Sequence, residues 1–177
     1  AMAGGAPLID ARHKAEFAKG FIPGSLNIQG NNSFATWAGW LLSYDQPFML
    51  LAPESELEDL TRKLMRIGLD NIMGYVPSVE AYVQSGGKLD TVKQIDVKEL
   101  KSLQGQPGVQ IVDLRGLTEF KSGHIKGASH VFVGTLPEHL NEINRDGKVV
   151  LHCQGGDRSS IGYSLLAKAG FRNILNY

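Results

Sequence analysis

The chain has 177 residues, of which 42% are hydrophobic and 20% are charged, as is ordinary for a globular protein with one large or two small domains. Eighteen Lys and Arg residues balance eighteen Asp and Glu residues. Because there is neither a net charge nor a basic run, we expect no binding of nucleic acid or of an anionic membrane surface.

The chain has one cysteine, Cys153, which excludes an internal disulfide, and no Cys/His cluster has the spacing of a zinc site. No apolar stretch approaches the ~18 residues of a membrane span. Residues 1–5 lack the charged and apolar regions of a signal peptide. These features favour a reducing compartment, so we expect a cytoplasmic location.

In the first half of the chain, an apolar stretch leads into Asp10 and Arg12, and residues 34–42 predict a helix with one aromatic face. That face holds Trp37 and Trp40. The two tryptophans either pack into the core or meet a neighbouring domain.

Residues 85–91 are polar and contain two adjacent glycines, which is typical of a flexible link. We therefore predict two domains, residues 1–88 and residues 89–177. After the link, a strand is expected near Val92, followed by a helix that Asp96 caps, because a glutamate stands three residues further on.

The second half consists of short apolar strands that alternate with helices, which predicts an open α/β sheet of mainly parallel strands. Ligand sites in such sheets lie at the carboxyl ends of the strands. The expected strands are residues 109–114, 130–133, 149–153 and 174–177, and the expected helices are 118–122 and 160–169.

The two halves repeat one another. Residues 9–25 share with residues 112–128 an Asp-x-Arg pair, a Glu-Phe pair and two glycines at identical spacing, and the start of residues 68–72 recurs at 170–174. Two copies of one domain therefore lie in tandem. Each copy lacks a segment that the other has, so we expect the first to be incomplete at its amino end and the second at its carboxyl end.

Cys153 lies between an apolar strand and a predicted helix. Adjacent glycines let the backbone curl there, the helix directs free N–H groups back into the loop, and an arginine adds positive charge. Such a loop stabilises a thiolate, so we interpret Cys153 as a nucleophile in an anion-binding loop and not as a small core residue. The candidate binding residues that follow it are Gln154, Gly155, Gly156, Asp157, Arg158 and Ser159.

The first copy serves as an internal control for this loop. Counting back from Gly68 and Gly170, Cys153 corresponds to Leu51, and the residues after Leu51 include two glutamates where the loop has glycine and arginine. Thiol, glycines and arginine are lost together. We therefore expect the first copy to be inactive.

The same comparison assigns Asp113, Arg115 and Glu119 to the fold, because the first copy has all three residue types at the same spacing. The arginine is expected to tie the strand end to the following helix through a carboxylate. His124 is interpreted as a hydrogen-bonded turn residue, and His152 is expected to point away from the cysteine because side chains alternate along a strand.

The ordered motifs Asp-x-Arg, Glu-Phe-x-x-Gly-His-Ile-x-Gly-Ala and a strand running into His-Cys resemble the rhodanese family of sulfurtransferases, over nearly the whole chain in two copies. In the second copy these motifs are residues 113–115, 119–128 and 152–153. An inactive copy followed by an active one also resembles the C-terminal part of bacterial proteins in which a metallo-β-lactamase-fold persulfide dioxygenase precedes two rhodanese domains. Nothing in this chain supplies the metal ligands of such a dioxygenase.

The resemblance implies a sulfur transfer. The Cys153 thiolate would take the outer sulfur of thiosulfate or of a low-molecular-weight persulfide and pass it to sulfite, cyanide or a thiol. The N–H groups of residues 154–159 and the Arg158 guanidinium would hold the anions, Ser159 would add a hydroxyl donor, and Asp157 would brace the loop or the arginine. No metal or organic cofactor is required.

Two alternatives remain at this point. Cysteine-dependent phosphatases and arsenate reductases resemble His-Cys-x5-Arg, whereas only four residues separate Cys153 from Arg158. The tighter loop suits a terminal sulfur better than a phosphoryl group. The other alternative is a non-catalytic module of a larger fusion protein, which accepts a persulfide or docks a partner.

Overall fold

The computed structural model describes residues 5–177 and divides the chain into two compact units between Thr91 and Val92. Residues 1–4, which belong to the segment inspected for a signal peptide, lie outside the described residues. The domain boundary after residue 88 and the incompleteness of each copy remain predictions.

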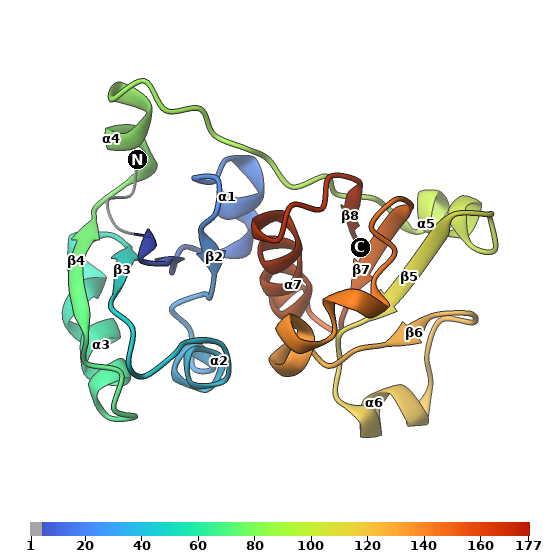
Figure 1. Ribbon diagram of the computed structural model, residues 1–177, viewed down its shortest axis with the longest axis horizontal. Coiled ribbons are helices and arrows are strands. Elements are labelled where there is room, and N and C mark those ends of the chain that lie inside the picture. The colour runs from blue at the N-terminus through green and yellow to red at the C-terminus, as the bar shows by residue number, and fades with distance from the viewer. Residues whose placement is uncertain (1–4) are drawn as a thin grey trace. The chain divides into compact units, whose positions relative to one another are not determined.

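Unit 1 contains a four-stranded parallel sheet in the order β2-β1-β3-β4, flanked by helices (Figure 1). Its elements are β1 (Leu8–Asp10), α1 (Lys14–Lys19), β2 (Leu26–Asn27), α2 (Phe34–Leu41), β3 (Phe48–Leu51), α3 (Glu54–Met65), β4 (Ile72–Val76) and α4 (Val79–Gln84).

Unit 2 repeats this architecture with the strand order β6-β5-β7-β8, again all parallel. The predicted fold class, two tandem parallel α/β domains, is therefore confirmed. The elements of unit 2 are α5 (Val97–Leu103), β5 (Val109–Asp113), α6 (Leu117–Ser122), β6 (Ser129–His130), two 3₁₀ helices (Val133–Glu138 and Leu140–Glu142), β7 (Lys148–His152), α7 (Asp157–Lys168) and β8 (Ile174–Asn176).

Two expected strands of unit 2 are wrong. The strand predicted over residues 130–133 is limited to β6, because the Val133 N–H bonds the Leu114 carbonyl at 3.3 Å and a 3₁₀ helix begins there. The strand expected near Val92 is only an isolated bridge between Gln94 and Asn176. The cap of the next helix is confirmed, since the Asp96 carboxylate accepts two backbone N–H groups at 2.8 Å each.

Helix α2 buries Phe34 and Ala38, and the aromatic face that we expected on it is not core. Trp40 is 53% exposed and Trp37 is half-buried. The core alternative is therefore wrong for Trp40, because Phe34 and Ala38, one turn apart, form the buried side of α2 and Trp40 does not.

The sheet of unit 2 has different helices on its two faces. Ile111 and Val150 are register partners and pack against Leu100 of α5. On α7, a Cβ built at Gly162 would lie only 2.3 Å from Leu114 Cδ1. The glycine therefore lets α7 approach the sheet closely, which fixes the amino end of α7 beside the carboxyl end of β7.

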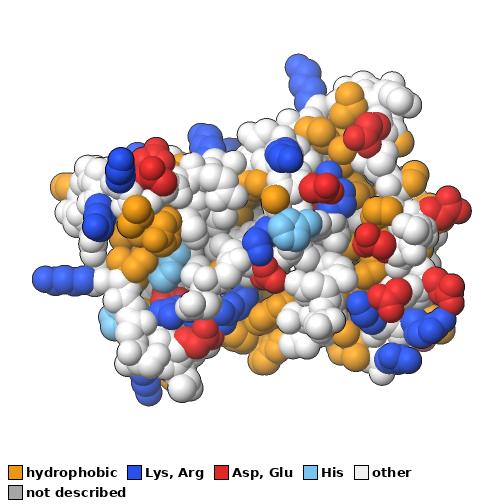
Figure 2. Space-filling view, turned by 180° about the vertical axis from the view of Figure 1, so that it is seen from behind, with side chains coloured by type: hydrophobic (Ala, Val, Ile, Leu, Met, Phe, Trp, Pro, Cys, Tyr) orange, Lys and Arg blue, Asp and Glu red, His pale blue; other side chains and the backbone are white. Residues whose placement is uncertain are grey.

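Positively and negatively charged side chains are mixed on the surface. On the face drawn in Figure 2, Lys and Arg side chains are interspersed with Asp and Glu side chains, and hydrophobic side chains form small patches between them. Among residues 5–177, no helix combines the length and apolarity needed to cross a membrane.

Candidate active site

The loop between β7 and α7 comprises residues 153–156, and the helix begins at Asp157, three residues before the expected start at Ser160. Arg158 and Ser159 therefore lie in the first helical turn and not in a loop. The early start depends on Gly156, whose φ of 91° is in the left-handed region that favours glycine. Asp157 then places a negative charge at the positive end of the helix.

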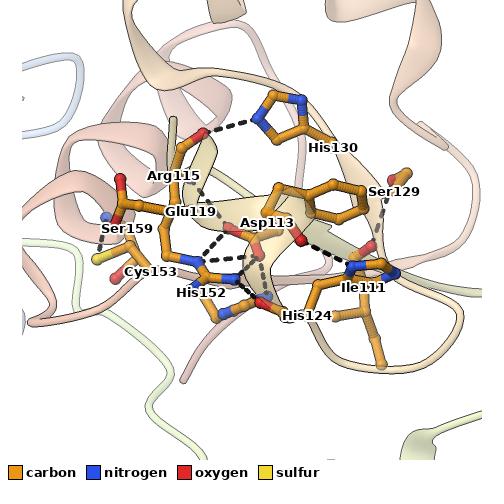
Figure 3. Close-up of polar contacts among 12 residues, drawn as sticks. Ile111, Asp113, Arg115, Glu119, His124, Ser129, His130, His152, Cys153 and Ser159 are labelled. Atoms are coloured by element: carbon orange, nitrogen blue, oxygen red, sulfur yellow. Dashed lines mark hydrogen bonds and ion pairs between the residues drawn. The ribbon is translucent and has the colours of Figure 1, made fainter. Parts of the chain in front are cut away.

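The sulfur of Cys153 receives two backbone hydrogen bonds. The Gly156 N–H lies 3.1 Å from Sγ, and the Ser159 N–H lies 3.4 Å from it; Figure 3 draws the second of these contacts. Cys153 is half-buried, and both N–H donors belong to the backbone at the start of α7. Two N–H dipoles converging at a helix amino end stabilise a negative charge on that sulfur.

The other candidate residues take different places around this sulfur. Gln154 and Gly155 are exposed at the tip of the loop. Ser159 is fully buried, and its hydroxyl donates to the Gly156 carbonyl at 3.2 Å, which ties the loop to the first turn of α7. In this structure the Ser159 hydroxyl is therefore engaged within the loop.

Arg158 forms a bidentate ion pair with Glu119 of α6, with Nη1–Oε2 and Nη2–Oε1 distances of 2.5 and 3.0 Å. The hydrogen bonds from Arg158 lower the pKa of Glu119, and Glu119 in turn raises the pKa of Arg158, so both side chains are charged. The Glu119 carboxylate also accepts the Gly116 N–H at 3.0 Å and caps α6.

The sequence comparison missed this ion pair, because it assigned Glu119 to the fold on the ground that the first copy also has a glutamate there. The residue that differs is its partner. The first turn of α3 carries Glu54 and Glu56 where the first turn of α7 carries Arg158, and this reversal of charge was the available signal that Glu119 has a second role.

The Asp-x-Arg motif forms the same bidentate contact in both units, as expected for a structural element. In unit 2 the Arg115 Nη2 lies 2.6 Å from Asp113 Oδ2 and 2.7 Å from the Gly123 carbonyl at the end of α6. In unit 1 the corresponding distances from Arg12 are 2.6 and 2.9 Å. Burial opposes ionisation of Asp113, but the hydrogen bonds from Arg115 hold the pKa of Asp113 below its ordinary value.

His152 shares a register pair with Asp113, and its Nε2 lies 3.5 Å from Asp113 Oδ2. Figure 3 draws both side chains. Burial lowers the pKa of His152, with the Asp113 charge opposing that change. His124 stacks on Phe120 with ring centroids 3.9 Å apart, and its Nδ1 lies 2.9 Å from the Phe120 carbonyl oxygen. Both contacts are those of the structural roles expected for these histidines.

The strand register corrects one correspondence between the copies. Asp10 pairs with Leu51 and Asp113 pairs with His152, so the counterpart of Cys153 is Ala52 and not Leu51. Counting back from the glycines failed because two residues connect β3 to α3, whereas four residues connect β7 to α7.

Both units match the same domain family. The family model described as "Rhodanese-like domain" matches residues 1–85 and again residues 96–177. The two matches lie in unit 1 and in unit 2, respectively.

Individual relatives are similar to only part of the chain. A protein named "Sulfurtransferase" from Allochromatium vinosum is 31% identical over 86 residues, which are 48% of this chain and 80% of that protein. "Rhodanese-like domain-containing protein 9, chloroplastic" from Arabidopsis thaliana is 30% identical over 118 residues, 47% of this chain and 50% of that protein. The chain spans between 50% and 57% of the length of three of the curated relatives that it matches.

Among solved structures, a "Rhodanese-like Domain Protein" from Staphylococcus aureus is 33% identical, with a TM-score of 0.44. The match covers 48% of this chain and 82% of that structure.

Proposed function

Since the rhodanese-like domain model matches nearly the whole chain in two copies, the chain belongs to the rhodanese-like domain family, and we propose that unit 2 is a sulfurtransferase with Cys153 as its nucleophile. The observation that carries this proposal is the pair of N–H groups, from Gly156 and Ser159, directed at the Cys153 sulfur. The proposal is also supported by the name of the Allochromatium relative.

In the first half-reaction, the Cys153 thiolate attacks the outer sulfur of the donor. With thiosulfate, the S–S bond of the donor breaks, sulfite leaves with the bonding electron pair, and Cys153 becomes an anionic persulfide. With a hydropersulfide RSSH, the thiolate RS⁻ leaves, and the Cys153 hydropersulfide then loses a proton to water. No electron is gained or lost overall in either case.

In the second half-reaction, a thiophile such as sulfite, cyanide or a thiolate attacks the terminal sulfur of the Cys153 persulfide. The persulfide S–S bond breaks, and the electron pair returns to Cys153 as a thiolate. The Gly156 and Ser159 N–H groups are fixed before the reaction, so they stabilise negative charge on sulfur without reorganising.

We infer that unit 1 is an inactive copy. Ala52, which occupies the register position of Cys153, is fully buried, and no other cysteine exists in the chain. The resemblance to the C-terminal part of a dioxygenase fusion protein and the cytoplasmic location remain predictions from the sequence.

The proposal is tested by intact-mass measurement of the protein after exposure to thiosulfate, and separately to a hydropersulfide. We expect a gain of one sulfur atom on Cys153 that sulfite or cyanide reverses and that Cys153→Ser abolishes. Ala52→Ser is the matched control, because it changes the equivalent position of the unit without a thiol, and it should leave the gain intact.

The same experiment separates the alternatives. An unchanged mass with both donors, together with hydrolysis of a phosphoryl ester, would indicate a phosphatase. A stable gain of sulfur that sulfite, cyanide and small thiols all fail to remove would indicate a persulfide-accepting module without turnover.

A further inference from the structure

Each of the two arginines beside the Cys153 loop is held by its own carboxylate. Arg115 binds Asp113 through Nε and Nη2, and Arg158 binds Glu119 through both terminal nitrogens. Arg158 lies in the first turn of α7, which follows the Cys153 loop, and the interaction with the Cys153 thiol is among the smaller causes that raise the pKa of each guanidinium. The four formal charges of these pairs cancel.

This cancellation determines what the loop offers to an anion. The loop supplies N–H dipoles at a helix amino end, which suit one negative charge, and Asp157 adds a further carboxylate in the first turn of α7. A dianion gains more than a monoanion from an uncompensated guanidinium, and it loses more when a carboxylate already neutralises that guanidinium.

The backbone cap that Glu119 makes at the start of α6 does not require its negative charge. Its bond to the Gly116 N–H belongs to a capping box, and a glutamine at that position supports such a cap as well as a glutamate does. The cap therefore accounts for a Glu or Gln at residue 119, and the ion pair with Arg158 is the further contact that uses its charge.

We propose that Glu119 determines the charge of the sulfur donor: by neutralising Arg158, it makes the site select hydropersulfides that carry at most one negative charge over dianionic thiosulfate. This inference rests on the proposed function of Cys153 and specifies its donor class. Glu119 acts through Arg158, so it is a specificity-determining positioning residue and does not itself react.

The test compares kcat/KM for thiosulfate with kcat/KM for the hydropersulfide of 2-mercaptoethanol, which carries no charge apart from its terminal sulfur. The wild type should favour the hydropersulfide. Glu119→Gln retains the cap and removes the charge, so the thiosulfate-to-hydropersulfide ratio should rise on the order of tenfold. Glu119→Asp retains the charge, so it should move the ratio by much less.

A matched control is available in the other capping box of unit 2. Glu99 accepts the Asp96 N–H at 3.1 Å at the start of α5, so Glu99→Gln removes one negative charge from an equivalent structural position away from Arg158. This variant should leave the ratio at the wild-type value. A comparable rise in Glu99→Gln would mean that the net charge of the domain, and not Glu119, sets the preference.

Other outcomes separate the inference from the function beneath it. If Cys153 takes sulfur from both donors but Glu119→Gln keeps the wild-type ratio within twofold, the donor selection by Glu119 is wrong and the sulfurtransferase stands. A wild type that prefers thiosulfate overturns the inference without any variant. A wild type that takes sulfur from neither donor overturns the proposed function itself.

Discussion

The backbone N–H of Gly156 lies 3.1 Å from the Sγ of Cys153, and the φ of 91° at the same glycine turns the chain so that the Ser159 N–H also comes within 3.4 Å of that sulfur. A residue with a side chain in this conformation is strained by about 1–2 kcal/mol. The contact that stabilises the thiolate and the turn that begins α7 therefore depend on the same glycine.

We expect Gly156→Ala to lower the free energy of unfolding by about 1–2 kcal/mol and to slow sulfur transfer by at least tenfold, because relief of the strain moves the Ser159 N–H away from the sulfur. Urea unfolding and initial rates measure the two effects. Gly105→Ala is the matched control, since Gly105 also has a positive φ, 77°, and open space for a Cβ, but lies in the turn after α5. Gly105→Ala should lose a similar amount of unfolding free energy and keep the wild-type rate of sulfur transfer. If the two variants transfer sulfur at the same rate, the role of Gly156 is refuted.

The paired arginines of the two units allow a second comparison. Arg115→Lys and Arg12→Lys each replace a bidentate guanidinium beside a fully buried aspartate. Because an ammonium cannot reproduce the two parallel bonds, each variant should lose about 1–3 kcal/mol of unfolding free energy. Only Arg115→Lys should also slow sulfur transfer. A rate loss of the same size in Arg12→Lys would show that unit 1 contributes to the reaction.

His152, which precedes Cys153, should make the stability of the protein depend on pH. Burial depresses the folded-state pKa of His152 below 6.5. Above pH 6.5 the His152 side chain is neutral in both the folded and the unfolded state, so its full contribution to the free energy of unfolding is present. As the pH falls below 6.5, the unfolded state binds the proton first and the free energy of unfolding decreases.

His152→Leu should remove this decrease, and a leucine is suitable there because Leu51 occupies the same register position beside Asp10 in unit 1. The measurement is urea unfolding of both proteins at pH 7.5 and pH 5.5. The pKa of Asp113 is also lowered, from 3.8, but that carboxylate loses its contribution only at lower pH. A wild type and variant with parallel pH dependence would contradict the assignment to His152.

Much of the fold follows from the sequence because local patterns determine it. The apolar strands that end at Asp113 and at His152 and the Asp96 cap each depend on residues within one short segment. The internal repeat then identifies the shared Asp-x-Arg contact, since the same residue types recur at the same spacing in both units.

The site was less predictable, because its decisive contacts depend on long-range geometry or on one backbone angle. Arg158 and Glu119 lie 39 residues apart in sequence, and only the folding of unit 2 brings them together. The start of α7 depends on the left-handed conformation of Gly156. The correspondence of Cys153 with Ala52 depends on a difference in loop length, which motif spacing alone did not reveal.

A thiol needs more than the register position of Cys153 to become reactive in this fold. Ala52 has the register position of Cys153, but it is 0% exposed, and Pro53 precedes α3 where Gly156 precedes α7. The following turn carries Glu54 and Glu56, which repel an anionic donor. Position alone should therefore not produce a persulfide carrier.

The measurement uses a double variant, Ala52→Cys with Cys153→Ser, so that the only thiol of the chain lies in unit 1. After exposure to the hydropersulfide of 2-mercaptoethanol, its intact mass should show no gain of sulfur, while the wild type gains one. Unfolding the double variant before exposure should restore reaction, which shows that the thiol is present and that the folded environment prevents its reaction. A gain of sulfur at position 52 in the folded protein would show that the glycine loop and its N–H donors are dispensable, because the fold would then activate a thiol without them.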